Sequence, residues 1–68
     1  MEARAMDIVY ECLRKAAPRD LSIEEIAKLA KMHRNTVGKY VLALEREGRI
    51  VMTRRLGNAK LYTPSKTR

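Results

Sequence analysis

Apolar residues recur every three or four positions through the first part of the chain, which is the spacing of one face of an α-helix. These apolar positions are Met6, Val9, Cys12, Leu13 and Ala16. They predict a first helix over about 3–17, which Pro18 ends because a proline disfavours helical geometry in the residue before it. Ile8 and Tyr10 lie on the flanks of this face, either as ordinary edge residues or as part of a dimer interface.

A second helix is predicted from its cap as well as from its periodicity. Ser22 and Glu25 have the spacing of a capping box, in which each side chain accepts a hydrogen bond from the other residue's amide. The helix that follows is expected to bury Ile26, Ala27 and Ala30. The two small alanines permit the close approach of a neighbouring helix.

A third helix is predicted to begin at His33 or Arg34 and to run to about Glu47. Met32 is the apolar residue of the turn before it, and Gly48 supplies the left-handed stop after it. Its inward positions are Val37, Val41 and Leu44.

Residues 50–63 have the composition of two strands joined by a tight turn. Gly57-Asn58 is one of the dipeptides that form two-residue turns, and Pro64 closes the second strand. The pattern therefore predicts a two-stranded β-hairpin, followed by a flexible basic tail at 65–68.

The predicted turn also suggests a register for the hairpin. It places Arg55 opposite Lys60 and Arg54 opposite Leu61. One face then holds Ile50, Met52 and Leu61, and the other holds Val51 and Tyr62. Because this splits the apolar residues between two faces, a longer loop or a bulge is an open alternative.

Charge is divided unevenly along the chain, whose net charge is +7. Residues 1–30 carry five basic and six acidic side chains, whereas residues 31–68 carry ten basic side chains against Glu45 and Glu47. Composition alone fits a membrane surface, an acidic protein or a nucleic acid as the partner. The uneven division indicates that the second half of the chain faces that partner.

Sixty-eight residues correspond to one domain, expected over 1–64. A domain of this size buries only about 60% of its unfolded surface and gains stability by dimerising. Cys12 has no partner for an intrachain disulfide, and its inward position favours a small core residue over a redox switch or an intermolecular bridge.

The chain has one histidine, no carboxylates clustered around it and no spacing of zinc ligands. We therefore expect a protein that is not an enzyme and that has no metal or cofactor. Neither a signal peptide nor an apolar run of spanning length is present, so the expected localisation is cytoplasmic, in association with the nucleoid and not with a membrane.

The segment AKLAKMHRNTVGKYVLALEREGRI resembles the helix-turn-helix of bacterial and archaeal winged helix-turn-helix transcriptional regulators, and RRLGNAKLYTPS resembles their wing. The resemblance covers most of the chain and is specific for the superfamily, not for a subfamily. Two positions depart from it: Lys31 stands where a glycine is usual in the turn, and His33 stands where a serine is usual.

This resemblance implies an α+β, mostly helical fold with three helices and a C-terminal two-stranded hairpin wing. It also implies sequence-specific binding of double-stranded DNA by a homodimer. The helix at 34–47 would enter the major groove, and the wing at 50–63 would lie on the backbone or in the minor groove.

The candidate DNA contacts on the third helix are Arg34, Asn35, Thr36, Lys39, Tyr40 and Arg46. They lie on the outward face or its shoulder when Val37 and Leu44 face the core. Asn35 suits an adenine edge, and Lys39 suits guanine acceptors or a phosphate. Arg34 stands at the helix N-terminus, where backbone amides also favour a phosphate. The alternative for each is a solvated surface side chain.

Other residues of this helix have roles that stay open. Thr36 and Tyr40 either donate to a phosphate or serve the fold, as a first-turn cap and a half-buried shoulder residue. Arg46 either contacts DNA or pairs with nearby acidic residues. Leu42 either contacts a thymine methyl group or packs on the wing or a partner, and His33 is either a cap or a pH-sensitive contact.

Arg54, Arg55 and Lys60 flank the tip of the predicted wing. Arginines of a wing bind phosphates or enter a narrow minor groove, where the potential is most negative. The alternative is a charged ribbon that discourages pairing at a sheet edge. The basic character of the whole half-chain favours contact with DNA.

Two other functions compete with sequence-specific regulation. A winged helix also serves as a protein-interaction module, and a basic domain also acts as a nonspecific architectural nucleic-acid-binding protein. No pocket for a small-molecule effector is evident from the sequence, and the sequence does not define the DNA site.

Overall fold

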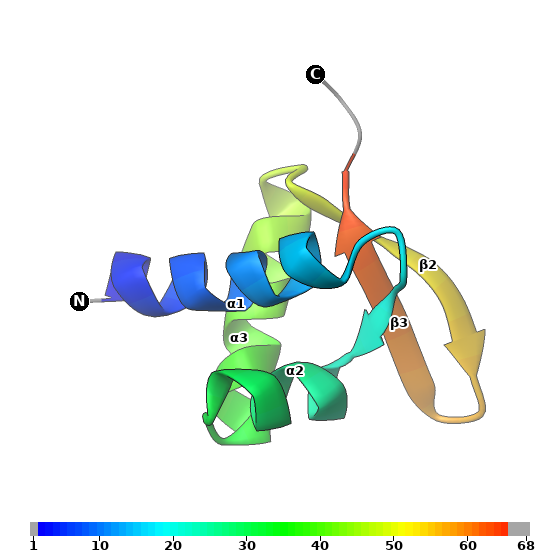
Figure 1. Ribbon diagram of the computed structural model, residues 1–68, viewed down its shortest axis with the longest axis horizontal. Helices are drawn as coiled ribbons and strands as arrows, with labels where there is room; N and C mark the ends of the chain where they lie inside the picture. The colour runs from blue at the N-terminus through cyan, green and yellow to red at the C-terminus, as the bar shows by residue number, and fades with distance from the viewer. Residues whose placement is uncertain (1, 66–68) are drawn as a thin grey trace.

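The computed structural model describes residues 2–65. Its elements are α1 (Glu2–Ala16), β1 (Leu21–Ser22), α2 (Ile23–Ala30), α3 (Arg34–Arg46), β2 (Ile50–Leu56) and β3 (Ala59–Pro64). The fold is α+β and mostly helical. The three helices pack together with α1 crossing α3, and the antiparallel sheet lies beside them (Figure 1). The β2–β3 turn points in the same direction as the N-terminal end of α3.

The sheet has three strands in the order β1-β3-β2, whereas the sequence predicts only the two of the hairpin. In the additional pairing, Leu21 lies opposite Tyr62 and Ser22 lies opposite Leu61. A strand of two residues is too short to produce an alternating pattern, and only the distant partner β3 defines it. The extra strand ties the base of the hairpin to the segment between α1 and α2.

The hairpin turn is formed by Gly57 and Asn58, as predicted, and Gly57 has φ +60°. A positive φ at the first central position is typical of a type II′ turn, which suits the twist of the flanking strands. The predicted pairs are confirmed near the turn, where Arg55 lies opposite Lys60 and Arg54 opposite Leu61.

Further along the hairpin a bulge at Thr53 changes the register, so that Met52 lies opposite Tyr62. The predicted face of Ile50, Met52 and Leu61 is therefore wrong, and the alternative of a bulge is correct. Tyr62 joins Ile50 in the core, while Leu61 lies on the opposite face beside Arg54.

The helix ends follow the predictions closely. The capping box of α2 is present: the Glu25 amide donates to Ser22 Oγ (3.2 Å), and the Ser22 amide donates to Glu25 Oε1 (2.9 Å). His33 is the N-cap of α3, and its Nδ1 accepts a hydrogen bond from the Asn35 amide (3.1 Å). Gly48 has φ +78°, which confirms the left-handed stop after α3.

The core lies between the helices and one face of the sheet. Its buried members are Val9, Leu13, Leu21, Ile26, Ala27, Val37, Val41, Leu44, Ile50 and Tyr62. Cys12 packs against this core and is partly buried, and burial raises the pKa of its thiol. At the C-terminal end, the Ser65 amide donates to the Arg49 carbonyl (2.8 Å), and residues 66–68 of the predicted tail lie outside the described residues.

Candidate nucleic-acid interface

The outward face of α3 carries the polar residues that the helical wheel predicts there. Asn35, Thr36, Lys39 and Arg46 are exposed. Tyr40 is half-buried and packs against the core, which matches its predicted position on the shoulder. Leu42 is also exposed on this helix. Apart from Tyr40, these side chains are exposed to solvent and accessible to an external ligand.

Arg34 begins α3 and forms an ion pair with Glu24 of α2, with 2.9 Å between its guanidinium nitrogen and Glu24 Oε2. Both side chains are mostly exposed. An exposed pair of this kind contributes little, about 0–1 kcal/mol. Arg34 can therefore leave Glu24 for a stronger anionic partner at small cost.

A groove of about 560 Å³ separates the N-terminal ends of α2 and α3 from the tip of the hairpin. It is lined by Ser22, Ile23, Glu24, Arg34, Asn35, Gly38, Asn58, Ala59, Lys60 and Tyr62. The groove brings together predicted site residues from two elements, Arg34 and Asn35 on α3 and Lys60 on β3. Gly38 lies in the same wall, and nothing lies within 4 Å of a Cβ added to it.

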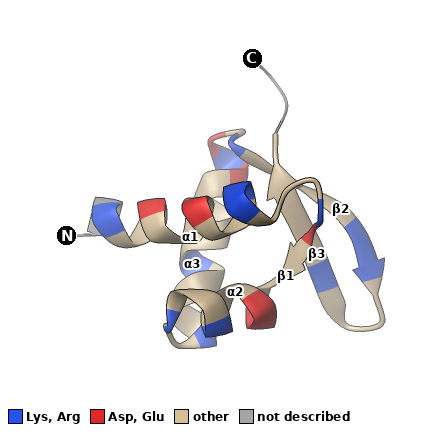
Figure 2. Ribbon diagram, in the orientation of Figure 1, with Lys and Arg blue, Asp and Glu red and all other residues tan. Residues whose placement is uncertain are grey.

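The basic residues of the hairpin are divided between its two faces. Lys60 is on the face of Tyr62, because residues two apart in a strand point the same way, and Arg55 lies opposite Lys60 on that face. This is the face that packs against the helices further along the strands. Figure 2 shows basic residues on both β2 and β3 near the turn.

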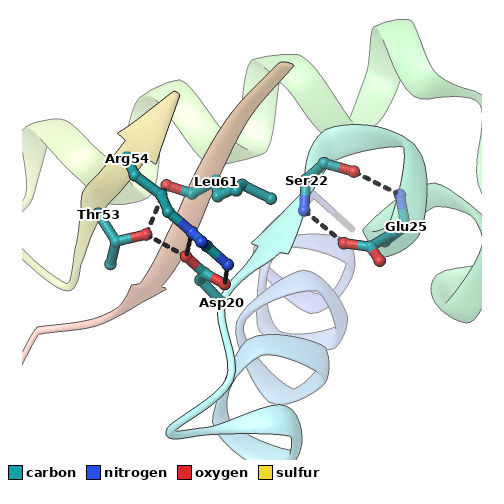
Figure 3. A network of polar contacts seen from close by, with 6 residues as sticks. All are labelled: Asp20, Ser22, Glu25, Thr53, Arg54 and Leu61. Carbon is teal, nitrogen blue, oxygen red and sulfur yellow. Dashed lines mark hydrogen bonds and ion pairs between the residues drawn. The ribbon is translucent and has the colours of Figure 1, made fainter. Parts of the chain in front are cut away.

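Arg54 lies on the other face and is engaged within the protein. Its Nε donates to Asp20 Oδ2 (2.9 Å), and its terminal nitrogen donates to Asp20 Oδ1 (3.3 Å). Thr53 Oγ1 donates to the same carboxylate (Figure 3). These hydrogen bonds, that of Arg54 first and that of Thr53 second, hold the pKa of Asp20 below its ordinary value. The carboxylate correspondingly raises the pKa of Arg54.

The structure therefore brings Arg34, Asn35 and Lys60 around one groove but separates Arg54 from them. Arg46 is exposed at the far end of α3. Sequence reasoning missed Asp20 and Glu24 as partners of the basic residues. Glu24 is ten positions from Arg34 and Asp20 is 34 positions from Arg54, so no local pattern indicates either pair.

Arg49 was not a candidate, and it is also held within the fold. Its guanidinium lies 4.4 Å from the centre of the Tyr10 ring and 3.8 Å from Glu47 Oε1. This contact joins α1 to the turn between α3 and β2. Arg49 therefore supports the helix packing at the end of the molecule away from the groove.

No family model, curated protein or solved structure matches this chain. Among residues 2–65, no three histidine, cysteine, aspartate or glutamate side chains are placed to hold a metal ion. None of the described helices combines the length and apolar character that a membrane crossing requires.

Proposed function

We propose that this protein is a winged helix-turn-helix DNA-binding protein and acts as a transcriptional regulator. In this proposal α3 enters the major groove, and the β2–β3 hairpin is the wing that lies on the neighbouring sugar–phosphate backbone. The observation that carries the proposal is the groove that α3 and the hairpin tip share, which Arg34, Asn35 and Lys60 line from both sides.

The dimensions of α3 suit a major groove. Its 13 residues make a helix about 20 Å long at about 1.5 Å per residue. A helix with side chains is about 10–12 Å in diameter, and the major groove of B-DNA is about 12 Å wide. Asn35 and Lys39 are four positions apart and so lie on one face, where both reach base edges.

The other basic residues supply backbone contacts in the proposal. Arg34 and Thr36 stand at the start of α3, where the helix dipole favours a phosphate. Arg55 and Lys60 share one face of the wing and bind phosphates of the adjacent strand or enter the minor groove. Tyr40 and Arg46 flank these contacts on the shoulder and at the far end of α3.

A homodimer of such domains would place its two α3 helices about 34 Å apart, one turn of the duplex. Its partner would be an inverted repeat, and its location would be the nucleoid. The first test is selection from a pool of random duplexes at physiological salt. Enrichment of an inverted repeat supports the dimer, a single half-site supports binding by a monomer, and no enrichment contradicts sequence-specific regulation.

A second test measures affinity for the selected duplex against salt concentration. Contact with about six to ten phosphates predicts an affinity that falls about 10³–10⁵-fold between about 50 and 200 mM salt. Lys39→Ala should weaken binding by roughly 10- to 100-fold, since one good base contact is worth about 1–3 kcal/mol of discrimination. Lys15→Ala, on the exposed surface of α1, is the matched control and should leave affinity unchanged. Binding that is insensitive to salt contradicts the proposal.

The exposed apolar residues Val51, Met52 and Leu56 on β2 favour a second candidate, a protein-interaction module. In that case the edge strand β2 and not α3 would form the contact. The substitution Val51→Asp would then abolish partner binding, whereas Lys39→Ala would not. The DNA-binding proposal predicts instead that Lys39→Ala weakens binding of the duplex and that Val51→Asp does not abolish it.

A further inference from the structure

We propose that Asp20 keeps Arg54 off the DNA and thereby sets how many cations of the wing bind phosphate. Asp20 acts through Arg54 and is a positioning residue. This inference rests on the proposed DNA-binding function, since it concerns the charge that the wing presents to a duplex.

The two residues come from opposite edges of the sheet. Asp20 precedes β1, and Arg54 is in β2, while β3 lies between these strands. The side chain of Arg54 reaches across β3, and its two nitrogens donate to the two carboxylate oxygens of Asp20 (Figure 3). Two parallel hydrogen bonds fix the guanidinium plane and are stronger than a single contact between the same charges.

The β-bulge makes this arrangement possible. Without it, consecutive residues of β2 would point to opposite faces of the sheet. The extra residue at Thr53 interrupts the alternation, so Thr53 and Arg54 both reach Asp20. Thr53 Oγ1 also lies 3.3 Å from the Leu61 carbonyl oxygen, which holds the hydroxyl against β3.

The carboxylate of the Asp20–Arg54 pair is more buried than the carboxylate of the Glu24–Arg34 pair. The Asp20 side chain is only 13% exposed, whereas the side chain of Arg54 is 61% exposed. Asp20 accepts hydrogen bonds from both Arg54 and Thr53. If Arg54 moved to a phosphate, the carboxylate would keep only the Thr53 hydrogen bond and would lose the positive charge that balances it. Glu24, the partner of Arg34, is exposed and makes a single ion-pair contact. Arg34 is therefore available to DNA, and Arg54 is withheld.

The basic residues of the wing therefore differ in whether their charge is available to a phosphate. Arg55 and Lys60 on one face release counterions when they bind phosphate, and each such contact changes the slope of log affinity against log salt by about 0.9. Arg54 is already neutralised by Asp20 and releases none. Neutralising Asp20 should free Arg54 and add about one phosphate contact.

The test compares salt slopes for duplex binding by the full chain and its variants. The slope of log affinity against log salt is negative, and Arg55→Ala should make it shallower by about 0.9. Arg54→Ala should leave the slope unchanged. Asp20→Asn should make the slope steeper by about 0.9. Adding Arg54→Ala to the Asp20→Asn protein should return the slope to the wild-type value. Thr53→Val removes a hydrogen bond to Asp20 without changing any charge, so it should leave the slope unchanged.

Each outcome either supports or overturns the inference. If Arg54→Ala reduces the slope as much as Arg55→Ala does, Arg54 binds DNA directly and the inference is wrong, even though the DNA-binding proposal stands. This comparison does not depend on whether Asp20→Asn folds. An unchanged slope for a folded Asp20→Asn protein also overturns the inference. If binding of the wild-type protein to the duplex does not depend on salt, the proposed function and the inference are both overturned.

Discussion

Lys31 ends α2 with φ +59° and ψ +45°, in the left-handed region. A residue with a Cβ is strained there by about 1–2 kcal/mol, which is why glycine is usual at such a position. The conformation lets the amides of Lys31 and Met32 both donate to the Ala27 carbonyl. The turn between α2 and α3 therefore adopts this left-handed backbone although the sequence has no glycine there.

We predict that Lys31→Gly raises the free energy of unfolding by about 0.5–1 kcal/mol, because relief of the strain exceeds the entropy that glycine loses on folding. Chemical denaturation of the purified protein measures this change. Lys31→Ala is the matched control: it removes the same charge but keeps the strained Cβ, so it should give no rise. Equal stability of the two variants would contradict the explanation.

His33 stands where the resemblance to winged helix-turn-helix regulators leads us to expect a serine. Its imidazole Nδ1 accepts the hydrogen bond from the Asn35 amide that a serine hydroxyl would accept. The ring therefore satisfies one of the free amides at the start of the helix. Both departures from the superfamily pattern are compatible with the turn and the cap that the pattern implies.

At the scale of the elements, α3 contains a glycine where a helix normally disfavours one. Glycine in a helix interior costs about 0.5–1 kcal/mol relative to alanine. Nothing lies within 4 Å of a Cβ at Gly38, so packing within the protein does not require the small residue. Gly38 instead lines the groove between α3 and the hairpin tip, which the absence of a side chain leaves wider.

We predict that Gly38→Ala raises the free energy of unfolding by about 0.5–1 kcal/mol and lowers affinity for duplex DNA, because the new methyl group points into the groove. Thermal or chemical denaturation measures the first effect, and titration with the selected duplex measures the second. The reverse change in the same helix, Ala43→Gly, should lower stability. A destabilised Gly38→Ala protein would show that the fold itself needs the glycine.

Which elements could be predicted follows from the range of the interactions that define them. The helices were predictable because their periodicity and caps are local, as with Ser22 and Glu25 three positions apart. β1 was not, because its two residues are a strand only through pairing with β3. At the site, the helical periodicity of α3 predicted which of its residues face outward. The bulge at Thr53 and the Asp20–Arg54 pair could not be predicted, because both depend on the assembled sheet.

At the scale of the whole molecule, the hairpin is joined to the helices at several points. β1 pairs with β3 at the base of the hairpin, and Asp20 binds Thr53 and Arg54 further along it. Ser65 bonds Arg49 beyond β3. The hairpin therefore has a fixed orientation relative to α3.

We predict that acid weakens the connection through Asp20. The pKa of Asp20 is lowered in the folded protein, so its ionised form stabilises the fold above its unfolded pKa of about 3.9. This contribution is lost as the pH falls through the lowered folded value. The difference in free energy of unfolding between wild type and Asp20→Asn should therefore shrink as the pH falls below about 4.

Denaturation curves at a series of pH values measure that difference. Glu11 also has a lowered pKa, because of its hydrogen bond with Arg14, but it is present in both proteins and cancels in the comparison. A difference that stays constant down to the lowest pH would show that the charge of Asp20 does not support the fold.

The pairing of β1 with β3 has a consequence for how the chain is made. Leu21 of β1 pairs with Tyr62 of β3, so this strand pairing closes a loop that spans most of the sequence. Long-range pairings form late, since their loop-closure entropy must be overcome before they stabilise the chain. During synthesis on the ribosome, the three helices can begin to associate early. The sheet, and with it the fixed position of the β2–β3 hairpin, is completed only when β3 has left the exit tunnel.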